Sequence, residues 1–76
     1  MRVLSGKDVI AILSSFGFSV VGQKGSHVKL RREINGTRQS LTVPNHTELD
    51  RGTAKAIFNQ AMRYISEDEL RKQFYE

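Results

Sequence analysis

The pair Asn35-Gly36 stands between two runs in which polar and apolar residues alternate. Both residue types tolerate the positive φ angles of a type I′ turn, and an Asn-Gly pair in this setting is the strongest short-range signal for a β-hairpin. The spacing predicts antiparallel strands over residues 27–34 and 37–43. Pro44 then ends the second strand, because proline cannot donate to a strand ladder. This hairpin constrains the fold more than any other feature of the chain.

A third strand is predicted immediately before the hairpin. Residues 18–23 are rich in β-forming side chains, and the stretch Gly22-Gln23-Lys24-Gly25 is typical of a turn. The three predicted strands therefore follow one another along the chain as an antiparallel meander.

Three helices are predicted, because polar caps precede apolar residues at helical spacing. The first begins near Gly6 and ends before Gly17. The second begins after Asp50. A short third helix over 65–76 is expected to follow a core formed by residues 1–64. The predicted caps are Ser5 with Asp8, then Asp50, then Ser66 with Glu69.

The predicted order of elements is α-β-β-β-α with a short C-terminal helix, an α+β fold. It is the order found in double-stranded-RNA-binding domains. Two helices are expected to cover one face of the three-stranded antiparallel sheet and to leave the other face in water. At 76 residues the chain is expected to form a single domain, residues 1–76. The expected core residues are Phe16, Phe18, Val20, Leu30, Leu41, Val43, Ile57 and Phe58.

Composition excludes several classes of function. The chain has no cysteine and only two histidines, so neither a disulfide framework nor a thiolate zinc site is possible, and no metal site or cofactor is expected. No apolar run approaches the length of a membrane span. Lys7 and Asp8 interrupt any apolar signal region near the N-terminus, so we expect a cytoplasmic protein.

The positive charge of the chain is concentrated in one segment. Five basic residues and one acidic residue fall between positions 24 and 38, and this segment alone accounts for the net charge of +4. Strand alternation turns Val28, Leu30 and Ile34 toward the core and leaves His27, Lys29 and Arg31 on the outer surface. Such a surface suits a polyanion, and a histidine within it can move protons at neutral pH. The alternative is that these charges only solvate the strands and prevent edge-to-edge aggregation.

Three motifs in this order resemble those of HicA-type toxins, the mRNA-cleaving members of bacterial toxin–antitoxin pairs. They are Lys24-Gly25-Ser26-His27 entering a strand, Val43-Pro44-Asn45-His46 closing the next strand, and Arg51-Gly52-Thr53 opening a helix. The resemblance implies a double-stranded-RNA-binding-like fold, an endoribonuclease in which His27 is the essential histidine, and a HicB-type antitoxin as partner. Many relatives carry histidine or an aromatic residue after the essential histidine, where this chain has Val28.

Without a metal, the simplest chemistry is attack of a ribose 2′-hydroxyl on its own phosphate, with His27 removing the proton. Cationic side chains would hold the phosphate and offset its developing charge. His46 is interpreted as a turn histidine, with RNA contact or a second acid as its alternatives. Ser26 is interpreted as a turn residue and not a nucleophile, since no acid–base partner for it can be read from the sequence. The predicted RNA-binding residues are Lys24, Gly25, Ser26, Lys29, Arg31, Arg38, His46 and Lys55.

Two other functions fit the same residues. A non-catalytic RNA-binding module would use the basic sheet face to dock across an A-form minor groove. A pure interaction protein would use it to bind an acidic partner. For the toxin, the free chain is expected to be monomeric and to form a hetero-oligomer with its antitoxin.

Overall fold

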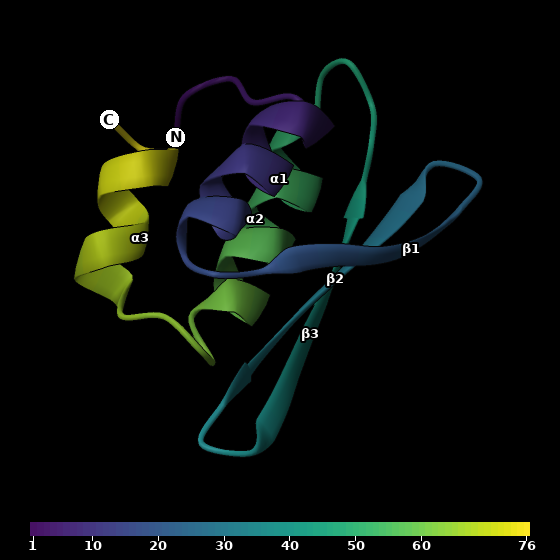
Figure 1. Cartoon of the computed structure of the whole chain (residues 1–76). Helices are drawn as coiled ribbons and strands as arrows, with labels where there is room; N and C mark the ends of the chain where they lie inside the picture. The colour runs from purple at the N-terminus through teal and green to yellow at the C-terminus, as the bar shows by residue number, and fades with distance from the viewer.

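The three strands form one antiparallel meander with β2 in the centre. In the computed structural model, which describes all 76 residues, the strands are β1 (Ser19–Lys24), β2 (His27–Ile34) and β3 (Thr37–Pro44). The helices α1 (Gly6–Ser15), α2 (Arg51–Ala61) and α3 (Glu67–Phe74) gather on one side of this sheet (Figure 1). The predicted α+β order is therefore confirmed. No helix is long and apolar enough to cross a membrane.

The two hairpin turns are tight, and both depend on residues that accept a positive φ. Asn35 and Gly36 have φ angles of 52° and 77°, which confirms the predicted type I′ turn. The first turn is Gly25-Ser26, with Gly25 at a φ of 58°, because β1 continues to Lys24. The predicted turn over 22–25 is wrong for a physical reason. A bulge between Val20 and Gly22 takes up one extra residue, which keeps Gly22 within the strand.

All three helix caps form as predicted. Ser5 and Asp8 exchange hydrogen bonds between side chain and backbone, at 3.0 and 2.9 Å. The Asp50 carboxylate accepts from the Thr53 backbone nitrogen at 2.6 Å. These bonds hold the pKa of the Asp8 and Asp50 carboxyls below the ordinary value. Ser66 caps α3 by accepting from the Glu69 nitrogen at 3.4 Å.

The apolar residues form one core cluster between the sheet and the helices. Val28, Leu30, Leu41 and Val43 point from the sheet into this cluster, as the alternation predicts. Leu70 and Phe74 of α3 are fully buried in the same cluster, and the Phe74 ring meets the Phe58 ring edge-on at 5.3 Å. The helix predicted as an appendage thus contributes to the core. The remaining members are Leu4, Val9, Ile12, Leu13, Phe18, Leu49, Ala54, Ile57, Ala61 and Ile65.

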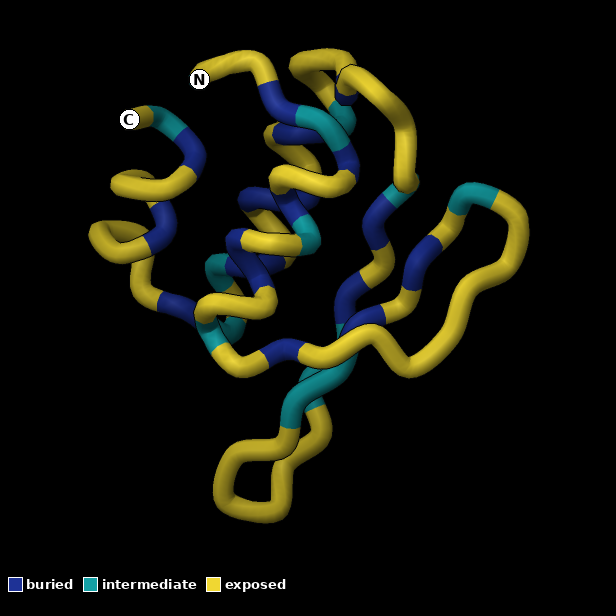
Figure 2. The backbone as a smooth tube through the Cα atoms, turned by 45° about the horizontal axis from the view of Figure 1, so that its top comes forward, coloured by how far each residue is buried: buried dark blue, intermediate teal, exposed yellow.

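Three residues expected to be buried in the core are not. Val20 is 53% exposed and Ile34 is 41% exposed, while Phe16 is only half-buried. The helices pack over β3, so the edge strand β1 lacks a covering layer, and the β2–β3 hairpin extends beyond the helices. Figure 2 shows this arrangement: the buried segments lie in the helices and in the part of the sheet beside them, and the tip of the β2–β3 hairpin is exposed. Strand alternation gives the face of a side chain and not whether a helix covers it.

Arg32 ties the central strand to the ends of two helices. Its guanidinium donates to the carbonyl oxygens of Phe16 and Tyr64 at 2.6 and 2.7 Å. Phe16 is the C-cap of α1, and Tyr64 follows α2. A cation at these positions satisfies free carbonyls and complements the negative end of each helix dipole. The same side chain donates to Gln39 at 2.6 Å and lies 4.8 Å from the centre of the Phe18 ring. Arg32 therefore belongs to the fold and not to the exposed basic surface.

Candidate active site and nucleic-acid interface

His27 stands at the first position of β2, exposed on the face of the sheet turned away from the core. Its direct partners are Lys24 of β1 and Pro44 of β3. Directly paired residues of antiparallel strands share a face, so the register places an ammonium group beside the imidazole. Lys29, two residues further along β2, lies on the same face opposite Gly22. Because Gly22 has no side chain, this part of the face is open to a ligand.

The remaining predicted cations are more distant from His27. Arg31 is half-buried on the outer face, and its Nε atom is buried without a hydrogen-bond partner. Arg38 pairs with Glu33, six residues along β2 from His27, which corresponds to about 20 Å of strand. Lys55 is exposed on α2, which packs on the other face of the sheet. The structure thus brings Lys24 and Lys29 to His27 and leaves Arg38 and Lys55 elsewhere.

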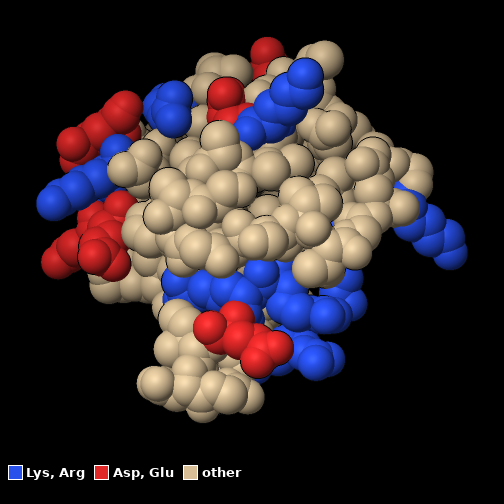
Figure 3. All heavy atoms as spheres, viewed as in Figure 1, with Lys and Arg blue, Asp and Glu red and all other residues tan.

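The largest group of positive side chains and the largest group of acidic side chains lie in different parts of the molecule. Figure 3 shows Lys and Arg gathered where β2 and β3 run below the helices, with further positive charge toward the β1–β2 hairpin. Acidic side chains gather at α3, whose first turn holds Glu67, Asp68 and Glu69. An anionic ligand is therefore attracted to the sheet and repelled by the start of α3.

The second histidine lies beside the turn that leads into His27. The His46 Nε2 atom is 3.3 Å from the Ser26 hydroxyl. A backbone hydrogen bond joins the same two segments: the Asn45 nitrogen donates to the Ser26 carbonyl at 2.6 Å. The structure thus shows a hydrogen-bond partner of the Ser26 side chain that could not be read from the sequence. His46 also contributes, after the hydrogen bonds from Thr53, to the lowered pKa of Asp50, so these two side chains are electrostatic neighbours.

Gly6 allows the His46 loop to approach the first helix. The Gly6 nitrogen donates to the His46 carbonyl at 2.8 Å. A Cβ at this position would collide with the Pro44 carbonyl oxygen and lie 2.6 Å from the Asn45 Cα. Only glycine permits this approach. The sequence pattern predicts Gly6 only as the start of a helix, because the sequence carries no local signal for its contact with a loop about 40 residues away.

A hollow of about 320 Å³, lined by polar residues, opens between this loop and α1. No apolar side chain lines it, and Lys7 supplies its positive charge. Lys7 is not among the predicted site residues, because in the sequence it stands out only as a charge that interrupts the apolar N-terminus. The lining residues are Ser5, Lys7, Asn45, His46 and Thr47.

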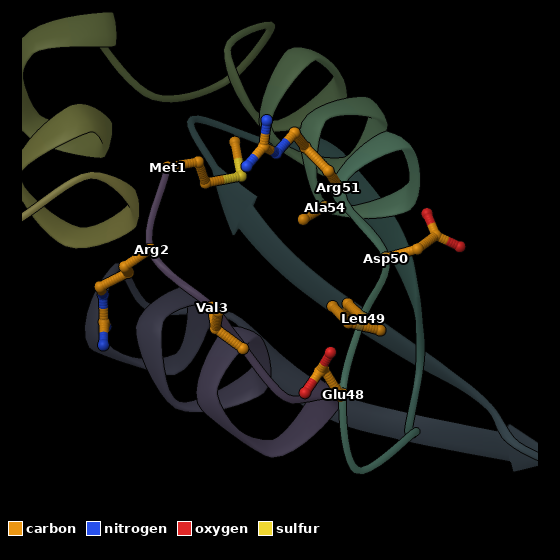
Figure 4. A pocket seen from close by; sticks show the side chains of 8 residues that line it. All are labelled: Met1, Arg2, Val3, Glu48, Leu49, Asp50, Arg51 and Ala54. Carbon is orange, nitrogen blue, oxygen red and sulfur yellow. The ribbon is translucent and has the colours of Figure 1, made fainter.

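A separate cavity of about 200 Å³ lies between the N-terminal segment and the start of α2 (Figure 4). None of the predicted site residues lines it. The Asp50 carboxylate points away from the other side chains drawn there, consistent with its role as the cap of α2. The lining residues are Met1, Arg2, Val3, Glu48, Leu49, Asp50, Arg51 and Ala54. The structure contains no cluster of three or more His, Cys, Asp or Glu side chains that could hold a metal ion.

Comparison with known proteins identifies the family. The family model described as "HicA toxin of bacterial toxin-antitoxin" matches residues 6–62, from the first residue of α1 to the C-cap of α2. This range contains both histidines and the basic segment and excludes α3. No curated protein and no solved structure matches the chain. The match covers most of the chain and, through the toxin–antitoxin pair, implies an antitoxin partner. The protein belongs to the HicA toxin family of bacterial toxin–antitoxin systems.

Proposed function

We propose that this toxin is an endoribonuclease that cleaves mRNA in the cytoplasm, with His27 as the group that accepts the proton. The observation that carries the proposal is the register of the outer face. It pairs the exposed His27 with Lys24 and places Lys29 on the same face. An imidazole between two ammonium groups combines a proton acceptor with anion binding, which are the two requirements for cleaving a phosphodiester.

The proposed reaction begins at the ribose 2′-hydroxyl. His27 takes the hydroxyl proton while the oxygen attacks the adjacent phosphorus, and a 2′,3′-cyclic phosphate is formed. Lys24 and Lys29 offset the charge that develops on the phosphate oxygens. The tight Gly25-Ser26 turn lets the backbone approach the RNA, and Arg31 extends the contact along the sheet. No metal is required in this scheme, so cleavage is expected to persist in excess chelator.

The same exposed face is the surface on which we expect an antitoxin to inhibit the toxin. We propose that the antitoxin is HicB-like, carries acidic residues, and covers His27 together with Lys24 and Lys29. Complementary charge makes such an association fast and salt-sensitive. RNA and antitoxin would then compete for one surface, and the monomeric toxin would become part of an inactive hetero-oligomer.

The decisive experiment compares His27→Ala with the natural chain in RNA cleavage and in growth arrest. His27 is exposed, so its removal is expected to abolish both activities without changing the thermal unfolding temperature. Thr37→Ala serves as the matched control, since Thr37 is exposed on β3 at the opposite end of the sheet. A His27→Ala protein that cuts RNA at the natural rate refutes the assignment.

The same experiment tests the non-catalytic alternative. The exposed basic face around His27, Lys24 and Lys29 also fits a protein that binds RNA without cutting it. That function predicts RNA binding by the natural chain with no cleavage product under any condition. The proposed enzyme predicts instead that His27→Ala still binds RNA and that the natural chain leaves 2′,3′-cyclic ends.

A further inference from the structure

A second histidine, His46, is held beside the turn that leads into the proposed catalytic histidine. Ser26 immediately precedes His27, and its hydroxyl is 3.3 Å from the His46 Nε2 atom. Pro44, the strand partner of His27, lies two residues before His46. The paired ends of β2 and β3 therefore place both imidazoles at the same end of the sheet.

The position of His46 is held by its backbone and not by its ring. The His46 nitrogen donates to the Pro44 carbonyl at 2.9 Å, and its carbonyl accepts from Gly6 at 2.8 Å. The Asn45 nitrogen anchors the same loop to Ser26 at 2.6 Å. The imidazole itself is exposed and makes a single hydrogen bond, to Ser26. Because the imidazole contributes little to holding its loop in place, it is available to interact with a substrate.

The chemistry of the proposed reaction requires a second proton-transfer group. A ribose 5′-oxygen is a poor leaving group unless it is protonated as its bond to phosphorus breaks, and a positioned acid supplies this proton. In an in-line displacement the attacking and leaving oxygens lie on opposite sides of the phosphorus. One histidine therefore cannot serve both oxygens at once, and a second proton-transfer group on the other side of the phosphorus is required.

We propose that His46 is the general acid of this reaction, an inference that rests on the proposed ribonuclease function. His27 takes the proton of the 2′-hydroxyl, and the new bond forms between the 2′-oxygen and phosphorus. The bond from phosphorus to the 5′-oxygen breaks, and that oxygen takes a proton from the His46 imidazolium. In the imidazolium both ring nitrogens carry a proton, so Nε2–H, 3.3 Å from the Ser26 hydroxyl, donates to Ser26 and Nδ1–H makes the transfer. Solvent restores both imidazoles to their starting protonation states.

The hollow beside His46 provides space for the departing strand. None of the five residues that line it is hydrophobic, and Lys7 is the only Lys or Arg among them. A nucleotide that leaves past His46 would enter this hollow and not the packed side of the sheet.

The test uses an RNA oligonucleotide cut by the natural chain at a mapped phosphate, and the same oligonucleotide with sulfur replacing the bridging 5′-oxygen at that phosphate. A thiolate leaves without being protonated, so this substrate does not need a general acid. His46→Ala is expected to cut the oxygen substrate about 100- to 1000-fold more slowly than the natural chain, and the sulfur substrate within about fivefold of it. His27→Ala is expected to fail on both.

Two further variants separate chemistry from structure. Ser26→Ala is expected to show the His46→Ala pattern more weakly, because only the orientation of the ring is lost. Glu48→Gln, in the same exposed loop and without a side-chain hydrogen bond, is expected to match the natural chain on both substrates. Equal losses of His46→Ala on oxygen and sulfur, or no loss on oxygen, would overturn the assignment of His46 and leave that of His27 intact. Failure of the natural chain to cut any RNA would instead refute the proposed function itself.

Discussion

Replacing Gly6 with alanine should destabilise the protein, although alanine is the better helix former. The added methyl group would collide with the Pro44 carbonyl oxygen and lie 2.6 Å from the Asn45 Cα and 2.9 Å from the His46 nitrogen. All three contacts are with backbone atoms, which cannot rotate away as a side chain can. Reaching an ordinary separation of 3.4 Å from the Asn45 Cα requires a shift of about 0.8 Å.

The cost of this shift has three parts. Steric overlap with packed backbone typically costs about 1–3 kcal/mol. Loss of the Gly6–His46 hydrogen bond increases the destabilisation by about 1 kcal/mol. The higher helix propensity of alanine offsets about 0.5–1 kcal/mol of it. The net free energy of unfolding should therefore fall by about 1–3 kcal/mol. For a domain of this size that corresponds to a midpoint of thermal unfolding lowered by about 5–20 °C.

Gly52→Ala is a closely matched control. Gly52 also lies in the first turn of a helix, and its added Cβ would meet only the Asp50 side chain, at an ordinary 3.5 Å. This variant should be neutral or stabilised by up to about 1 kcal/mol. Thermal unfolding followed by circular dichroism compares the three proteins directly. If the two alanine variants unfold at the same temperature, the close contact between α1 and the His46 loop is not a constraint on the fold.

Three further predictions concern the fold and the basic face. Arg32→Met should lower the free energy of unfolding by about 2–4 kcal/mol, because the carbonyl oxygens of Phe16 and Tyr64 lose their hydrogen-bond donor. Chemical denaturation measures this loss, and a loss no larger than that of Arg38→Ala would contradict the prediction. The folded-state pKa of Asp50 lies below its ordinary value of 3.8, so its contribution to stability is present above that pH and is lost as the pH falls through the lowered pKa. Asp50→Asn keeps an acceptor for Thr53, and its loss of stability between about pH 5 and pH 2 should be smaller than that of the natural chain, whereas equal losses would contradict this origin. Neutralising Lys24 or Lys29 should weaken both RNA binding and cleavage, and each change should reduce the slope of log affinity against log salt by about one unit. Arg38→Ala should weaken binding alone. An unchanged slope after both lysines are replaced would show that the RNA binds to another surface.

Local patterns in the sequence were sufficient to predict most of the fold. The Asn35-Gly36 turn and the caps at Ser5, Asp50 and Ser66 each depend on residues that are neighbours along the chain. The exposed side chains of Val20 and Ile34 could not be predicted in this way. Their burial depends on how far the helices extend over the sheet, which is a property of tertiary packing. The buried positions of Leu70 and Phe74 have the same origin.

The candidate site was predicted in part for the same reason. His27, Lys24 and Lys29 lie within six residues of one another, so strand alternation and one tight turn bring them together. The contacts of Gly6 with the His46 loop, and of Ser26 with His46, join residues about 40 and 20 positions apart. Arg32 was counted among the basic residues of the segment, because charge alone does not show that two carbonyl groups take up its donors.

The bonds of Arg32 have a consequence for the time course of folding. Its two carbonyl partners lie 16 and 32 positions away along the chain, at the ends of separate helices. These bonds can form only after both helices have docked on the hairpin, so they should be absent from the transition state. Replacing Arg32 should therefore leave the refolding rate almost unchanged and raise the unfolding rate by nearly the full loss of stability. Arg32 on the central strand thus affects the lifetime of the folded protein before it unfolds, and not the rate at which the protein folds.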